Sequence, residues 1–189
     1  MMLNWLYKEY SRHGWNAITR LFAKLLIRGD KYIDWLQICG VKIGKGSKIR
    51  CGLSAFPEPY MVSIGERVHV AGGVTFMTHD GALSWMSRAM GLTDERTDKI
   101  GPIVVKDNCF IGANALIMQN VTIGNNCIVG MGAIVTKDVP DNSVVAGVPA
   151  KVIASTDEYL EKYRNCKDYT CGWNYEEKRA YFENKYSKK

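Results

Sequence analysis

The sequence has no apolar run that approaches the roughly 18 residues needed by a membrane-spanning helix. Its N-terminus lacks the short basic region, the apolar run and the small-residue cleavage site of a secretory signal. The six cysteines follow no zinc-ribbon or zinc-finger spacing, and the three histidines are too few for a zinc-dependent hydratase. We therefore expect a cytoplasmic protein that binds no metal.

Positive charge is concentrated near the N-terminus. Residues 1–50 carry ten Lys or Arg against three acidic residues, whereas residues 51–150 carry six against nine. Apolar residues at helical spacing, with Trp, Tyr, Lys and Arg among them, predict one or two amphipathic helices over residues 3–37. Two interpretations of the arm formed by residues 1–40 stay open. It makes peripheral contact with the inner face of a membrane, or it packs on the domain with its basic face in solvent.

A six-residue repeat occupies the middle of the chain. Branched apolar residues recur at every sixth position without a miss: Val105, Ile111, Ile117, Ile123, Val129 and Val135. Because side chains along a strand alternate between its two faces, each of these residues returns to the same side. One short strand and one turn per repeat make a flat face, and three faces close a coil of about 18 residues. This geometry predicts that Val105 stacks on Ile123, Ile111 on Val129, and Ile117 on Val135.

The residues between the repeat positions suit the corners of such a coil. Small or slim residues stand two positions before each new repeat: Cys109, Ala115, Val121, Cys127 and Ala133. Asparagines that tolerate turn conformations recur with the same period: Asn108, Asn114, Asn120 and Asn126. Shorter runs of the repeat around Ile43 and Ile64 predict two earlier coils.

The repeat is interrupted once. It stops after Phe76 and resumes at Ile103, and residues 77–101 show no period, so we expect a long functional loop there. Helical spacing returns at residues 155–165 and 174–185. The chain is thus predicted to be mainly β, with a helical arm (1–40), a coiled domain (41–153) that contains the loop, and a helical tail (154–189).

The stretch IGANALIMQNVTIGNNCIVGMGAIVTKDVPDNSVVAGVPAKVI (111–153) resembles the hexapeptide-repeat acyltransferases. EPYMVSIGERVHVAGGVTFMTHDG (58–81) is similar to family members of capsule and O-antigen biosynthesis. The resemblance therefore favours the sugar and polysaccharide O-acetyltransferases, near the galactoside, maltose and streptogramin enzymes. It implies a left-handed parallel β-helix, a homotrimer, acetyl-CoA as co-substrate and no nucleic-acid partner. The implied reaction moves an acetyl group to a sugar hydroxyl of a surface polysaccharide precursor.

The same resemblance assigns the catalytic base to His79, in Met77-Thr78-His79-Asp80-Gly81. A histidine exchanges its proton near neutral pH and can take the proton of an attacking hydroxyl in a direct transfer. Asp80 is a candidate for orienting His79, with a backbone carbonyl as the alternative. Glu58 is a candidate for meeting the acceptor across a subunit boundary. Trp85 and Arg88, inside the interrupting loop, are expected to shape the acceptor site.

For acetyl-CoA, the resemblance implies a groove between coils of neighbouring subunits. It places Ala113 and Met131 along the pantetheine arm and Phe110 as an aromatic wall. Thr136, Lys137 and Lys151 are placed near the phosphates. The two lysines also suit an anion on charge alone, because cations are few in this part of the chain.

Two other functions stay open. The same scaffold could acetylate a hydroxyl of an antibiotic, or it could be a non-catalytic β-helix. Retention of His79 together with VTKDVP and PAK favours an enzyme.

Overall fold

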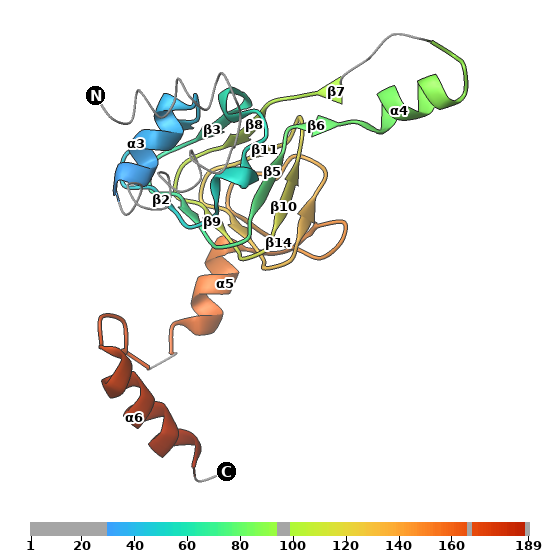
Figure 1. Cartoon of the computed structure of the whole chain (residues 1–189). Helices are drawn as coiled ribbons and strands as arrows, with labels where there is room; N and C mark the ends of the chain where they lie inside the picture. The colour runs from blue at the N-terminus through green and yellow to red at the C-terminus, as the bar shows by residue number, and fades with distance from the viewer. Residues whose placement is uncertain (1–29, 94–98, 166–167, 188–189) are drawn as a thin grey trace. The chain divides into compact units, whose positions relative to one another are not determined.

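The structure is a computed structural model that describes residues 30–93, 99–165 and 168–187 (Figure 1). The chain divides into two compact units, Met1–Tyr159 and Leu160–Lys189. Most of the predicted arm, including its proposed membrane contact, lies outside the described residues. Its last part forms α3, Asp30–Ile38, whose Trp35 and Leu36 are fully buried. None of the described helices is both long enough and apolar enough to cross a membrane.

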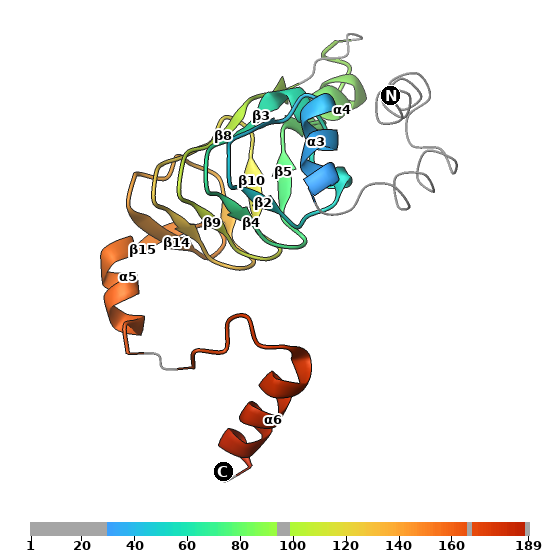
Figure 2. The ribbon, with the colours of Figure 1, turned by 90° about the vertical axis from the view of Figure 1, so that its left-hand side faces the viewer.

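Three parallel sheets form the sides of a coil (Figure 2). The first sheet holds β1 (Lys42–Ile43), β3 (Val62–Ile64), β8 (Ile103–Val105) and β11 (Thr122–Ile123). The second sheet holds β2 (Lys48–Ile49), β4 (His69–Val70), β9 (Phe110–Ile111), β12 (Ile128–Val129) and β14 (Ser143–Ala146), followed by the antiparallel β15 (Lys151–Ser155). The third sheet holds β5 (Thr75–Met77), β10 (Leu116–Met118) and β13 (Ile134–Val135). From β3 to β5, and again from β8 to β13, the chain visits the three sheets in turn.

The stacking expected from the repeat is confirmed. Val105 pairs with Ile123, Ile111 with Val129, and Ile117 with Val135. All six side chains are at most 1% exposed. Since each repeat residue lies on the one a full coil away, the apolar side chains form a continuous core, and their burial stabilises the coil at roughly 25 cal/mol per Å².

The corners follow the expected pattern of asparagines. The φ angles of Asn108, Asn114, Asn120 and Asn126 lie between 56° and 62°, in the left-handed region that asparagine tolerates better than most residues. Their side chains also link the coils, because the Asn108 amide donates to Oδ1 of Asn126 at 2.9 Å, and the Asn126 amide donates to Oδ1 of Asn142 at 2.8 Å.

The described cysteines near the coil pack in its core. Cys39, Cys51, Cys109 and Cys127 are buried. Burial raises the pKa of the Cys39 and Cys51 thiols to about 12, so both thiols stay protonated at neutral pH. No cluster of three potential metal-ligating side chains occurs in the part of the chain that the structure describes.

The interrupting segment is more ordered than the sequence suggested. It begins and ends in an antiparallel ribbon, β6 (His79–Asp80) with β7 (Lys99–Ile100), and contains α4, Ala82–Ala89 (Figure 1). No residue of α4 is buried, although its Leu83 and Met86 stand at helical spacing. The two C-terminal helices are as expected, α5 at Thr156–Tyr163 and α6 at Tyr175–Tyr186.

Candidate active site

The candidate active site is built where the chain leaves the third sheet. His79 follows β5 and opens the ribbon β6/β7. Its side chain is 45% exposed, and its Nδ1 lies 3.0 Å from both carboxylate oxygens of Glu58, which is only 20% exposed. The structure therefore joins two residues that stand 21 positions apart in the sequence.

Glu58 reaches this position because the segment before β3 folds over the end of the third sheet. The segment forms two short 3₁₀ helices, η1 (Leu53–Ala55) and η2 (Pro59–Met61), and η1 contacts β5. Between them, the buried ring of Phe56 stacks on Phe76 with centroids 5.0 Å apart. This stack fixes the segment against β5 and brings Glu58 to the residues that follow that strand.

Asp80 has a different contact from the one expected. Its Oδ1 accepts a hydrogen bond at 2.9 Å from the backbone N–H of Ala82, in the first turn of α4. An acceptor at this place satisfies one of the free N–H groups of a helix N-terminus. Glu58 is thus the carboxylate that contacts His79, while Asp80 accepts a hydrogen bond from the start of α4.

The predicted acceptor residues lie together on α4. Trp85 and Arg88, with Ala89, are the described residues lining a hollow of about 270 Å³. Trp85 is 75% exposed. Its indole presents a large apolar face with a single donor, a combination suited to one face of a sugar ring.

The predicted donor residues border the third sheet. Ala113 and Met131 precede β10 and β13, and the backbone N–H of Gly132 donates to the carbonyl of Ala113 at 2.8 Å. Thr136 and Lys137 follow β13. In the third sheet β5 pairs with β10, and β10 pairs with β13. Thr136 and Lys137 therefore lie two strands away from the end of β5, where His79 follows, which corresponds to about 10 Å at the usual strand spacing.

Phe110 and Lys151 lie on the second sheet instead. The Phe110 ring stacks on His69 with centroids 5.3 Å apart, and it remains 46% exposed. Lys151 begins β15 and pairs with Ala146 of β14. Lys137 and Lys151 are exposed and form no ion pair with any residue that the structure describes. Their charges are therefore available to an anion such as the phosphates of a nucleotide thioester.

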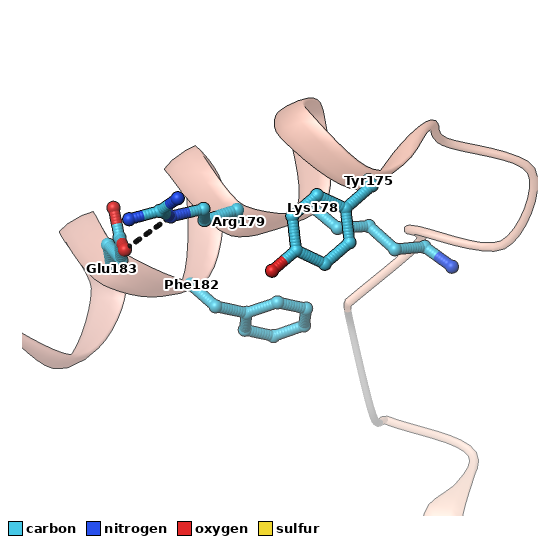
Figure 3. Close-up of a pocket in the computed structure, with 5 residues that line it drawn as sticks. All are labelled: Tyr175, Lys178, Arg179, Phe182 and Glu183. Carbon is cyan, nitrogen blue, oxygen red and sulfur yellow. Dashed lines mark hydrogen bonds and ion pairs between the residues drawn. The ribbon is translucent and has the colours of Figure 1, made fainter.

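A second hollow, of about 390 Å³, lies on α6 in the C-terminal unit (Figure 3). Its lining residues are Tyr175, Lys178, Arg179, Phe182 and Glu183, and Arg179 is paired with Glu183. None of the residues predicted from the sequence for catalysis or donor binding lies there.

The chain is similar to several known proteins. The family described as hexapeptide repeat of succinyl-transferase matches residues 102–137. Protein CapG of Staphylococcus aureus is 42% identical over 171 residues, which cover 89% of this chain and 96% of CapG. A maltose O-acetyltransferase from Clostridium difficile is 27% identical with a TM-score of 0.56, over 79% of this chain and 87% of that one.

A hexapeptide-repeat acetyltransferase of Vibrio cholerae, solved with acetyl-CoA, is 27% identical with a TM-score of 0.52. That match covers 62% of this chain and 61% of the other, less than two thirds of either. The repeat, the near full-length relative and the solved acetyltransferases agree on one assignment. The chain is an acyltransferase of the hexapeptide-repeat family and is related to Protein CapG over nearly its whole length.

Proposed function

We propose that the protein transfers an acetyl group from acetyl-CoA to a sugar hydroxyl, with His79 as the general base. The observation that carries this proposal is the Glu58 carboxylate on Nδ1 of a half-exposed histidine. A carboxylate in this place accepts the Nδ1 proton as a hydrogen bond and so selects the tautomer whose Nε2 has a free lone pair. It also stabilises the imidazolium that forms during the reaction.

The proton balance follows from this tautomer. Nε2 of His79 removes the proton of the acceptor hydroxyl as its oxygen attacks the thioester carbon. The carbon–sulfur bond then breaks, and the imidazolium returns the proton to the departing thiolate. The acetyl ester and free CoA are the products, and no covalent enzyme intermediate forms. A non-catalytic scaffold would have no use for the Glu58–His79 pair.

The acceptor is proposed to be a sugar of a surface polysaccharide precursor, bound against Trp85 and Arg88. The test is a screen for acceptor-dependent CoA release with nucleotide sugars, lipid-linked sugars and hydroxyl-bearing antibiotics, the last serving the alternative of antibiotic acetylation. We expect release with a sugar acceptor and none with the antibiotics. CoA release with an antibiotic alone would show that the acceptor is an antibiotic and not a sugar. CoA release with none of these acceptors would refute the proposed function.

For the donor, Lys137 and Lys151 are proposed to hold the phosphates of acetyl-CoA. Lys137→Ala should weaken acetyl-CoA binding about tenfold, as expected for losing a charged contact, but weaken dephospho-acetyl-CoA much less. Calorimetric titration of both ligands measures this difference. Lys106→Ala, which removes an exposed lysine near Asp141, is the matched control. An equal loss for both ligands would refute a contact with the 3′-phosphate.

The assembly is proposed to be a homotrimer of left-handed β-helices, as the family implies. The segment between β6 and β7 supports this, because α4 and the turn after it expose five large apolar side chains: Leu83, Trp85, Met86, Met90 and Leu92. An eight-residue helix without buried residues is marginal in water, and a second copy of the chain would cover its apolar side chains. Light scattering should give about three times 21.2 kDa, whereas a monomeric mass would remove the shared donor groove.

A further inference from the structure

Thr78 is a buried polar residue for which the proposed reaction has given no role. Its side chain is 0% exposed, although it directly precedes the half-exposed His79. Neighbouring residues of an extended chain point to opposite sides, so Thr78 faces the interior where His79 faces outward. A hydroxyl removed from water is costly unless it forms hydrogen bonds, and the partners of Thr78 indicate its role.

Both partners of this hydroxyl belong to Glu58. The Thr78 hydroxyl donates to Oε2 of Glu58 and accepts a hydrogen bond from the backbone N–H of the same residue at 3.3 Å. The two bonds close a ring that holds Glu58 at its backbone and at the end of its side chain. A free glutamate side chain populates many rotamers, and this ring selects one of them.

The carboxylate held by Thr78 is the one that contacts His79. We propose that Thr78 is a positioning residue for the acetyl transfer: its hydroxyl fixes the Glu58 carboxylate so that His79 keeps its proton on Nδ1 and its lone pair on Nε2. This inference rests on the proposed role of His79 as the base. Thr78 touches neither substrate in this scheme and acts only through Glu58.

Paired variants separate positioning from packing. Thr78→Val keeps the shape of the side chain and removes the hydroxyl, whereas Thr78→Ser keeps the hydroxyl. We expect Thr78→Val to lower kcat about tenfold, the effect of one hydrogen bond to a charged group, with both KM values unchanged. Thr78→Ser should stay within about twofold of the parent, because it retains that bond. Thr122→Val, at a half-buried threonine of β11 on the first sheet, is the matched control and should leave kcat unchanged.

A double-mutant cycle tests whether Thr78 acts through Glu58. If it does, Thr78→Val should add little to the loss already caused by Glu58→Gln, since residues that act as one unit are not additive. Losses that multiply would overturn the proposal. So would a Thr78→Val variant with the parent kcat, or a Thr78→Ser variant as impaired as Thr78→Val.

NMR spectroscopy of the His79 ring tests the positioning role of Thr78 without a measurement of enzyme turnover. Ring-nitrogen NMR shifts of His79 report which nitrogen carries the proton of the neutral ring. We expect Nδ1–H in the parent and in Thr78→Ser, and a mixture of tautomers in Thr78→Val. An unchanged tautomer in Thr78→Val would refute the positioning role. Absence of acetyl transfer to any acceptor would instead refute the proposed function and leave this measurement interpretable.

Discussion

His79→Ala is expected to lower kcat by about 10²- to 10⁴-fold, the usual contribution of a general base. The loss follows because alanine removes the imidazole that contacts Glu58. Acetyl-CoA should bind the variant as tightly as the parent, since none of the donor candidates is in contact with this imidazole in the structure. Acceptor-dependent CoA release gives kcat, and calorimetric titration gives the donor affinity.

His69→Phe is the matched control for this variant. It also removes an imidazole, but it keeps an aromatic ring to stack on Phe110 and should keep kcat within a few-fold of the parent. The kcat of Glu58→Gln should lie between those of His79→Ala and His69→Phe. An amide fills the same space as the carboxylate but lacks the charge that stabilises the imidazolium. Parent-like turnover in His79→Ala would refute the assignment of the base.

Gly124→Ala is expected to destabilise the coil strongly, because the added methyl group meets the next coil. A Cβ at this position would lie 2.3 Å from Oδ1, 2.6 Å from the backbone N and 2.8 Å from Cα of Asp141. Two of these atoms belong to the backbone of the next coil, so a rotation of the Asp141 side chain cannot relieve the clash. The carboxylate of Asp141 also accepts a hydrogen bond from the Asn125 N–H at 2.8 Å, which the methyl group would displace.

We expect the free energy of unfolding of Gly124→Ala to fall by about 1–3 kcal/mol, the range for overpacked sites. The melting temperature should fall by about 2–4 °C for each kcal/mol in a chain of this size. Gly52→Ala is the control, because the nearest atom to its added Cβ is Oγ of Ser54 at 3.8 Å and its backbone is extended. Equal melting temperatures for the two variants would contradict the close approach of the coils at Gly124.

Much of the coil was predictable because its information is local and repeated. A residue placed every six positions faces the same way after each turn, so the pairs Val105–Ile123 and Ile111–Val129 follow from spacing alone. The asparagine corners were predictable for the same reason, since each turn needs a residue that tolerates positive φ. The position of His79 next to an interruption was also visible in the sequence.

The partner of His79 was not predictable from spacing. Asp80 is its neighbour in the chain, yet Asp80 accepts a hydrogen bond from the backbone of Ala82, and Glu58 contacts the imidazole. That outcome depends on the Phe56–Phe76 stack, which folds the segment before β3 over the end of the third sheet. Pro-Glu-Pro at residues 57–59 marks a turn but gives no indication of the strand against which it will lie.

The sequence by itself therefore determined the coil, its register and the residue at which the coil is interrupted, because a repeat specifies each pair of contacts from its own period. Only the tertiary structure decided which carboxylate meets His79 and which buried hydroxyl holds that carboxylate. Thr78 and Glu58 are 20 positions apart, and nothing periodic relates them. Contacts of this kind arise once, from the way a non-repeating segment packs on a strand, and they become visible only when that packing is known.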